Sequence, residues 1–177
     1  MNEPLVGIVM GSDSDLPVMQ EAAKILEEFG IASEVHTLSA HRTPEAIVKY
    51  VKKSEAAGYK VFICGAGGAA HLAGVVAAHT ELPVIGVPLA SAKMGAAGVD
   101  ALFSTAQMPP GIPVATVAIN GAKNAGILAA QIIGTGDETV RAKVSAYKQK
   151  LGGDVFAKDA KLQEKGFKKY LEEQGLI

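Results

Sequence analysis

The sequence predicts an α/β protein, a three-layer α/β/α sandwich built on a doubly wound parallel sheet. Three observations lead to this fold class. Short apolar runs alternate with segments of helical periodicity up to about residue 135. The apolar runs are nearly continuous, which is typical of parallel strands buried on both faces. Hydrophobic residues make up 49% of the 177-residue chain and are mainly Ala, Val, Ile and Leu, so one domain can bury a sizeable core.

The first strands and helix are predicted from a change in hydrophobic period. Leu5–Met10 is an apolar run and indicates a buried strand. Leu16–Phe29 carries apolar residues at helical spacing, and Gly30 follows it as a helix stop. Glu34–Leu38 is the second predicted strand, so the chain begins with the strand–helix–strand order of a parallel sheet.

The following segments repeat this order. A helix is predicted over Pro44–Ala57, with Thr43 as its cap and Pro44 at its first position. The remaining strands and helices are predicted, in alternation and in chain order, at Lys60–Gly65, Ala69–His79, Val84–Pro88, Gly98–Gln107, Val114–Ile119 and Ala122–Ile133. Five such units predict a flavodoxin-like or Rossmann-like sheet, in which ligands bind beyond the carboxyl ends of the strands.

A helical tail is predicted after the sheet. Asp137–Leu151 is a further helix, Gly152-Gly153 is expected to end it, and a last helical segment covers residues 154–173. We therefore divide the chain into an α/β domain, residues 1–135, and a C-terminal helical extension, residues 136–177. The extension is expected to pack on neighbouring subunits of a homo-oligomer. The alternative is that it packs on its own domain.

Composition and charge exclude several classes of function. The formal net charge is −1, so no global field would attract nucleic acid or an anionic membrane. Residues 140–177 carry nine Lys or Arg against five Asp or Glu, but interleaved acids and few aromatics favour a solvated helix face over a nucleic-acid site. The single cysteine, Cys64, lies in an apolar run and is expected to be a buried, inert thiol.

Targeting and metal-binding patterns are not found in the sequence. The N-terminal residues Met1–Pro4 do not form the basic region that precedes the apolar stretch of a signal peptide. No apolar run approaches the roughly 20 residues needed to span a bilayer, so we expect a cytoplasmic protein with no membrane partner. Neither a pair of cysteines nor a His-x-x-x-His spacing occurs, so we expect no metal site.

The first candidate site is the turn Gly11-Ser12-Asp13-Ser14-Asp15, between the first strand and its helix. Glycine lets a ligand approach the backbone closely, while the hydroxyls of Ser12 and Ser14 and the helix N-terminus suit an anion such as phosphate. Asp15 suits the hydroxyl groups of a ribose. The alternative interpretation is that Ser14 or Asp15 only caps the helix.

The second candidate site, Ser39-Ala40-His41-Arg42-Thr43-Pro44, follows the second strand, which should neighbour the first. Arg42 is one of two arginines in the chain, and its guanidinium has the shape for bidentate phosphate binding. His41 can donate or accept a proton near neutral pH. The alternative is a solvated histidine beside a surface arginine.

The third candidate site is the glycine-rich segment Gly65–Leu72, which follows the third strand and matches the Gly-x-Gly-x-x-Gly/Ala dinucleotide pattern. The acidic residue expected after the next strand is missing, because that strand ends in Gly86-Val87-Pro88-Leu89. We therefore interpret the glycines as room for a flat ring against the backbone. His71 is interpreted as a contact to that ring or to another polar substrate group, or else as a histidine bonded to backbone at the start of a helix.

Taken together, these loops resemble the N5-carboxyaminoimidazole ribonucleotide mutase family, the class I enzymes of purine biosynthesis. The resemblance covers about residues 5–135 in order and rests on Met10–Asp15, Ser39–Pro44, Gly65–Leu72, Gln107-Met108-Pro109 and Asn124–Gln131. It implies an isomerase that converts N5-carboxyaminoimidazole ribonucleotide to 4-carboxy-5-aminoimidazole ribonucleotide. It also implies that the enzyme needs no metal, nucleotide or biotin cofactor, and that it forms a homo-octamer whose C-terminal helices reach neighbouring subunits.

The roles of the family's residues carry over by position. The resemblance implies that Ser12 and Arg42 bind the phosphate with support from Ser14, and that Asp15 binds the ribose. It implies that His41 is the general acid and base. The remaining substrate-binding residues, which would include the contacts to the ring and the migrating carboxylate, are Ser39, Ala66, Gly67, Gly68, Ala69, His71 and Leu72.

The chain departs from the family pattern at Ala73, where the family usually has Pro, and within residues 90–106, which are expected to shape a lid or a subunit contact. One alternative function is the class II reaction, which carboxylates aminoimidazole ribonucleotide with free carbon dioxide. The Gly-Gly-Ala-Ala-His-Leu form of the third loop favours class I. Another alternative is a non-catalytic phosphorylated-ligand-binding or response-regulator module, but a phosphorylated receiver needs an acidic cluster where the third strand here ends in Cys64-Gly65.

Overall fold

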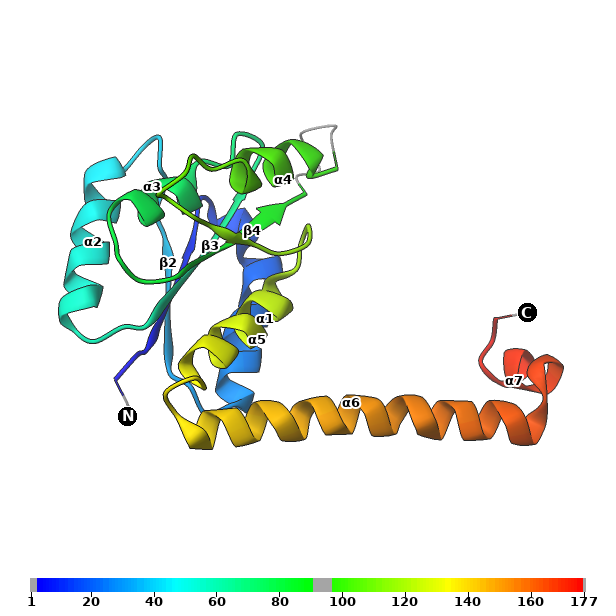
Figure 1. Cartoon of the computed structure of the whole chain (residues 1–177). Coiled ribbons are helices and arrows are strands. Elements are labelled where there is room, and N and C mark those ends of the chain that lie inside the picture. The colour runs from blue at the N-terminus through cyan, green and yellow to red at the C-terminus, as the bar shows by residue number, and fades with distance from the viewer. Residues whose placement is uncertain (1–2, 91–96, 177) are drawn as a thin grey trace. The chain divides into compact units, whose positions relative to one another are not determined.

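Five parallel strands form one sheet in a computed structural model, which describes residues 3–90 and 97–176. Their order across the sheet is β2-β1-β3-β4-β5, so the predicted flavodoxin-like sheet and the pairing of the first two strands are confirmed (Figure 1). Met10 lies beside Thr37 of β2 and Gly65 of β3, so the loops after these strands leave from one edge. The strands are β1 (Val6–Met10), β2 (Ser33–Thr37), β3 (Val61–Gly67), β4 (Val84–Leu89) and β5 (Ala115–Thr116).

Helices cover both faces of this sheet (Figure 1). On one face, α1 (Leu16–Glu28) packs against α5 (Ala122–Ile133). On the other face, α2 (Pro44–Ala56) and α3 (Leu72–Ala78) cover β1 and β3. The helix α4 (Val99–Ala106) contacts β4 and β5.

Apolar side chains fill the space between the sheet and the pair α2 and α3. This layer contains Val9 and Phe62 from the strands, Ile47 and Val51 from α2, and Cys64, all of them buried. Burial raises the pKa of the Cys64 thiol, which keeps the group protonated. The expected burial of this cysteine is confirmed.

Three elements differ in extent from the sequence-based expectation, and the first two of these differences affect the site. The strand β3 continues to Gly67, and α3 begins only at Leu72, three residues after its expected start at Ala69. The strand β5 is also shorter than expected: only Ala115–Thr116 pair regularly with β4. Because the chain before α3 stays outside the helix, the residues from Gly68 to His71 form a loop.

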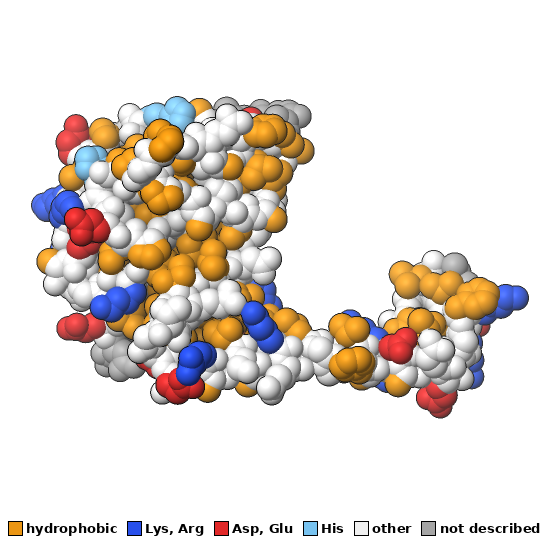
Figure 2. Space-filling model, in the orientation of Figure 1, with side chains coloured by type: hydrophobic (Ala, Val, Ile, Leu, Met, Phe, Trp, Pro, Cys, Tyr) orange, Lys and Arg blue, Asp and Glu red, His pale blue; other side chains and the backbone are white. Residues whose placement is uncertain are grey.

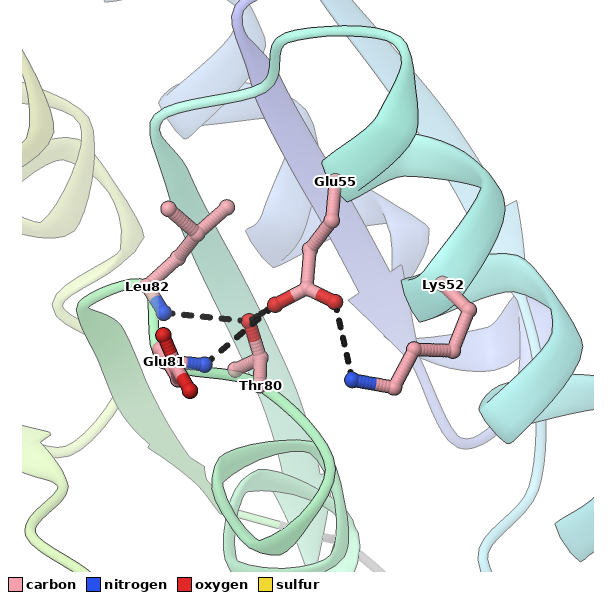
Figure 3. A network of polar contacts seen from close by, with 5 residues as sticks. All are labelled: Lys52, Glu55, Thr80, Glu81 and Leu82. Atoms are coloured by element: carbon pink, nitrogen blue, oxygen red, sulfur yellow. Dashed lines mark hydrogen bonds and ion pairs between the residues drawn. The ribbon is translucent and has the colours of Figure 1, made fainter.

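The end of α2 is tied to the turn before β4 by the carboxylate of Glu55 (Figure 3). The Thr80 hydroxyl donates to Glu55 Oε1 over 2.5 Å, and the Glu81 backbone N–H donates to the same oxygen over 3.3 Å. Lys52 Nζ donates to the other carboxylate oxygen over 3.0 Å, and the Leu82 N–H donates to the Thr80 hydroxyl over 3.1 Å. These five residues, which we call the Glu55 network, fix a loop at the amino-terminal edge of β4.

The chain divides into two compact units, Met1–Arg141 and Ala142–Ile177. The helix α6 (Glu138–Lys165) begins in the first and continues into the second, where α7 (Phe167–Glu173) follows. The expectation that Gly152-Gly153 would end a helix is wrong, since both residues lie inside α6. A glycine in a helix costs only about 1 kcal/mol relative to alanine, which the good helix formers on either side can offset. Within the described ranges, no helix has both the length and the apolar character needed to cross a membrane.

Candidate functional site

A cavity of about 360 Å³ lies at the carboxyl edge of β1, β2 and β3. Two backbone hydrogen bonds hold its walls together, from Gly11 N–H to the Gly65 carbonyl and from Leu38 N–H to the Met10 carbonyl. Its lining comes from the three loops singled out in the sequence: Gly11, Ser12, Ser14, Asp15, Ser39, Ala40, His41, Arg42, Ala66, Gly67, Ala69, His71 and Leu72. Of the proposed site residues, only Gly68 does not line this cavity.

The first loop is folded by its own side chains. Ser12 caps the short 3₁₀ turn Asp13–Asp15, because its hydroxyl oxygen accepts the Ser14 N–H over 3.3 Å and the Asp15 carboxylate accepts the Ser12 N–H over 3.1 Å. The Ser14 hydroxyl donates to the Ser12 oxygen over 2.9 Å. The sequence left the cap of the helix to Ser14 or Asp15. Asp15 is the N-cap residue of α1, but its side chain makes no cap hydrogen bond there, and the side-chain cap is made by Ser12 on the preceding 3₁₀ turn. This capping box places both hydroxyls at the cavity wall with a defined orientation.

The environment of Asp15 opposes its ionisation. Burial raises the pKa of this carboxyl, the hydrogen bond from the Ser12 N–H offsets part of that effect, and the negative charge of Asp13 adds to it. A carboxyl of this kind binds hydroxyl groups well, since they replace the water that burial removes. The position fits a ribose better than a phosphate, whose charge a carboxylate would repel.

The second loop holds Arg42 against the first loop at the cavity wall. Its Nη2 donates to the Gly11 carbonyl over 3.1 Å, and its Nε donates to the Ser39 hydroxyl over 3.3 Å. Thr43 precedes α2 as expected, but its hydroxyl makes no cap: it accepts the Ser39 N–H over 2.9 Å and so closes the loop. The guanidinium thus joins the first and second loops and leaves three of its five N–H groups unused by the described residues.

The third loop brings His71 to His41. The two imidazoles meet edge to face, with Nε2 of His41 and Nδ1 of His71 2.8 Å apart. One of these nitrogens must carry the proton of this hydrogen bond and the other must accept it. Both rings are solvent-exposed in the single chain, so the remaining nitrogens can reach a ligand in the cavity.

Gly68 shapes this loop from outside the cavity. Its φ of +61° lies in the left-handed region, which L side chains rarely adopt, and it turns the chain between β3 and His71. The sequence placed Gly11 and Ala40 in candidate loops but did not name them among the substrate-binding side chains, and both line the cavity. Neither residue has a side chain whose chemistry could have marked it. Across residues 3–90 and 97–176, no three His, Cys, Asp or Glu side chains gather as metal ligands.

The chain is similar in sequence and in fold to known proteins of one enzyme family. The family model for AIR carboxylase matches residues 5–153. The N5-carboxyaminoimidazole ribonucleotide mutase of Thermotoga maritima is 55% identical over 97% of this chain and 99% of its own length, and that of Pyrococcus horikoshii is 54% identical over 97% and 96%. The crystal structure of Treponema denticola PurE covers 90% of this chain and 98% of its own, with a TM-score of 0.82 at 35% identity.

Proposed function

Because this chain belongs to the AIR carboxylase family, we propose that it isomerises N5-carboxyaminoimidazole ribonucleotide to 4-carboxy-5-aminoimidazole ribonucleotide in the cavity described above. The isomerase role in purine biosynthesis follows from relatives of this name that are more than half identical over almost the whole chain. The observation that supports the site is the convergence of His41, Arg42 and Ser12 on one cavity.

The proposed reaction moves a carboxylate from N5 to C4 in two steps. The bond between N5 and the carboxyl carbon breaks, its electron pair stays on N5, and N5 takes a proton from His41 as carbon dioxide forms. C4 then attacks the carbon dioxide, and the proton that C4 loses returns to His41. The imidazole is unchanged at the end, as a general acid and base must be.

The cavity supports this chemistry by holding both fragments. Carbon dioxide and the aminoimidazole would recombine slowly in solution, but confinement in a small cavity gives them a high effective concentration. Ala66, Gly67 and Ala69 are small enough for a flat ring to lie on the backbone, with Leu72 beside them. His71 holds one nitrogen of His41 through their shared hydrogen bond and so sets how the imidazole faces the ring.

The phosphate is proposed to bind at the first and second loops. Arg42 supplies charge and N–H donors, while Ser12, Ser14 and Ser39, which line the same cavity, supply hydroxyls. Asp15 is proposed to accept hydrogen bonds from the ribose. This arrangement leaves the aminoimidazole ring of the substrate beside His41, where the carboxylate moves.

A direct assay distinguishes the proposed function from its alternatives. The purified protein is supplied with N5-carboxyaminoimidazole ribonucleotide, and separately with aminoimidazole ribonucleotide and carbon dioxide. Rapid turnover of the first substrate is expected. Efficient turnover of the second alone would assign the class II reaction instead, and binding without turnover of either would indicate a non-catalytic ligand-binding module.

We also propose a cytoplasmic homo-octamer in which residues 1–135 form the catalytic domain and 136–177 pack on neighbouring subunits. Support comes from exposed apolar side chains in the second unit, where orange surface gathers around α7 (Figure 2). Phe156 is 77% exposed and Phe167 66%. Such side chains are rarely left in water in clusters unless a partner covers them. The proposed reaction needs no metal, nucleotide or biotin cofactor, because the substrate already carries the carboxyl group that is transferred.

A further inference from the structure

We propose that Ser104 is a positioning residue for the isomerisation, because its hydroxyl holds the loop that carries His71. Ser104 lies on α4 and does not line the cavity. The proposal rests on the function assigned to that cavity. Its claim is that a helix which touches no substrate controls the orientation of the histidine pair.

The contact is a hydrogen bond from a buried amide. The Ala70 N–H donates to Ser104 Oγ over 2.9 Å, and Ala70 is only 2% exposed, so loss of this acceptor would leave a buried amide without its partner. The Ser104 hydroxyl has one proton, which can go to the Gly68 carbonyl at 3.4 Å or to the Ala101 carbonyl at 3.3 Å. With the Gly68 carbonyl as acceptor, the hydroxyl bridges the loop on both sides of Ala69.

The position of α4 is fixed by its contact with the sheet. Gly86 of β4 has no side chain, and a Cβ there would collide with the methyl carbon of Thr105. Thr105 is buried, and its hydroxyl donates to the Ala101 carbonyl of its own helix over 2.7 Å. Thr105 therefore packs α4 against β4, while its neighbour Ser104 contacts the loop that carries His71.

The loop transmits this constraint to the histidines over a short path. The His71 N–H donates to the Ala69 carbonyl over 2.9 Å, so the bend that Ser104 holds also sets the backbone of His71. Nδ1 of His71 meets Nε2 of His41 over 2.8 Å. Ser104 thus acts on His41 through Ala70 and His71, without touching the reacting atoms.

The test compares three variants for turnover. Ser104→Ala is expected to lower kcat by about tenfold to about a hundredfold, because small displacements of a reacting group have effects of that size. The KM should change little, since Arg42 and Ser12 belong to other loops. Ser104→Thr keeps the hydroxyl and should restore most of the kcat. Thr105→Val keeps the methyl group that packs on Gly86 and removes only a hydroxyl that is bonded within α4, so it should leave kcat near that of the unaltered protein.

Two spectroscopic readouts test the proposal without turnover. The imidazole ¹⁵N resonances of His41 and His71 should move in Ser104→Ala and stay in place in Thr105→Val. In the unaltered protein, amide exchange at Ala70 should be slow, and this measurement does not depend on whether any variant folds.

Each result has a defined meaning. The proposal would be overturned by an unchanged kcat in folded Ser104→Ala, or by an equal loss of kcat in Thr105→Val. It would also be overturned by a loss of kcat that Ser104→Thr does not restore, or by fast amide exchange at Ala70. Absence of turnover in the unaltered protein would instead overturn the proposed function. The resonances and the exchange rate would still decide whether Ser104 holds the loop.

Discussion

The imidazoles of His41 and His71 act as one unit at the scale of single residues. Their facing nitrogens are 2.8 Å apart, so one carries a proton and the other offers a lone pair. If both facing nitrogens carried protons the contact would be repulsive, so the tautomers of the two rings must match. In the proposed carboxylate shift His41 gives one proton and regains it, and the hydrogen bond to His71 holds its imidazole for both transfers.

The exchange of His41 for asparagine tests its role as acid and base. His41→Asn is expected to lower kcat by at least about a hundredfold, because a positioned acid and base contributes that much or more. Substrate binding, measured by calorimetry, should remain. His79→Asn, at the other end of α3 from His71, is the matched control and should leave kcat unchanged. Turnover retained by His41→Asn would remove this residue from the mechanism.

The two arginines offer a matched test of phosphate binding. Arg42→Ala is expected to weaken the binding of aminoimidazole ribonucleotide by about tenfold to about a hundredfold, the usual range for a lost charged hydrogen bond. The affinity for the unphosphorylated ribonucleoside should change much less. Arg141→Ala removes an exposed arginine paired with Glu138 and should leave both affinities as they were. Equal losses for ribonucleotide and ribonucleoside would contradict a phosphate contact.

At the scale of elements, the Glu55 network joins α2 to the turn before β4. Hydrogen bonding from the Thr80 hydroxyl is the main cause that lowers the pKa of the Glu55 carboxyl, with further help from Lys52 and the Glu81 N–H. A carboxyl whose pKa is lower in the folded state stabilises the fold above its unfolded pKa. That stabilisation is lost as the pH falls through the folded pKa.

Removal of this carboxylate should therefore have a pH-dependent effect. Glu55→Ala is expected to lower the free energy of unfolding by about 1–3 kcal/mol at pH 7, since it leaves the partly buried Thr80 hydroxyl without its acceptor. The difference from the unaltered protein should begin to shrink as the pH falls below about 4, where the carboxyl of the unfolded chain is protonated, and should be smallest below the lower pKa of the folded state. Denaturant unfolding of both proteins at several pH values measures this difference in the free energy of unfolding.

Glu21→Ala serves as the control for that series. Glu21 forms an exposed ion pair with Lys24 on α1, at 2.8 Å, and such pairs contribute only a few tenths of a kcal/mol. The Glu55 network would not stabilise the fold through its charge if Glu55→Ala lowered the free energy of unfolding equally at every pH. The same conclusion would follow if Glu21→Ala lowered the free energy of unfolding by as much.

Element boundaries show what local sequence can and cannot predict. Strands such as β1 were predictable because a buried parallel strand is a short, continuous apolar run. The Gly152-Gly153 pair misled the prediction, because a glycine that stops a helix often does so by turning the backbone to positive φ, as Gly166 does with φ of +73°, and Gly152 and Gly153 are not among the glycines with positive φ. The role of Thr43 was missed because its hydroxyl bonds within its own loop rather than to α2.

At the scale of the whole molecule, strand order explains why the site could be anticipated. The carboxyl ends of neighbouring parallel strands share one edge, so loops near Ser12, His41 and His71 had to meet once the first three strands paired. Ser104 could not be found in this way. Its contact with Ala70 spans 34 residues and depends on how α4 seats against β4, which no local pattern encodes.

The proposed assembly makes a prediction about the second unit, Ala142–Ile177. The unaltered chain should sediment at about eight times its mass of 18.2 kDa. Phe156→Asp and Phe167→Asp should each reduce that assembly, because a buried aromatic side chain stabilises an interface by about 1.5–3 kcal/mol, and a carboxylate in its place would be desolvated. Gln149→Asp makes the same charge change at an exposed polar position of α6 and should sediment normally.

The same variants separate assembly from catalysis. All the residues proposed here for chemistry and binding come from one chain and line one cavity in its first unit. If Phe156→Asp sediments as smaller species but retains turnover per chain, that cavity is sufficient for the reaction. If turnover falls together with the assembly, neighbouring subunits must contribute to the site or steady its loops. Normal sedimentation of both phenylalanine variants would instead show that these side chains do not hold the subunits together.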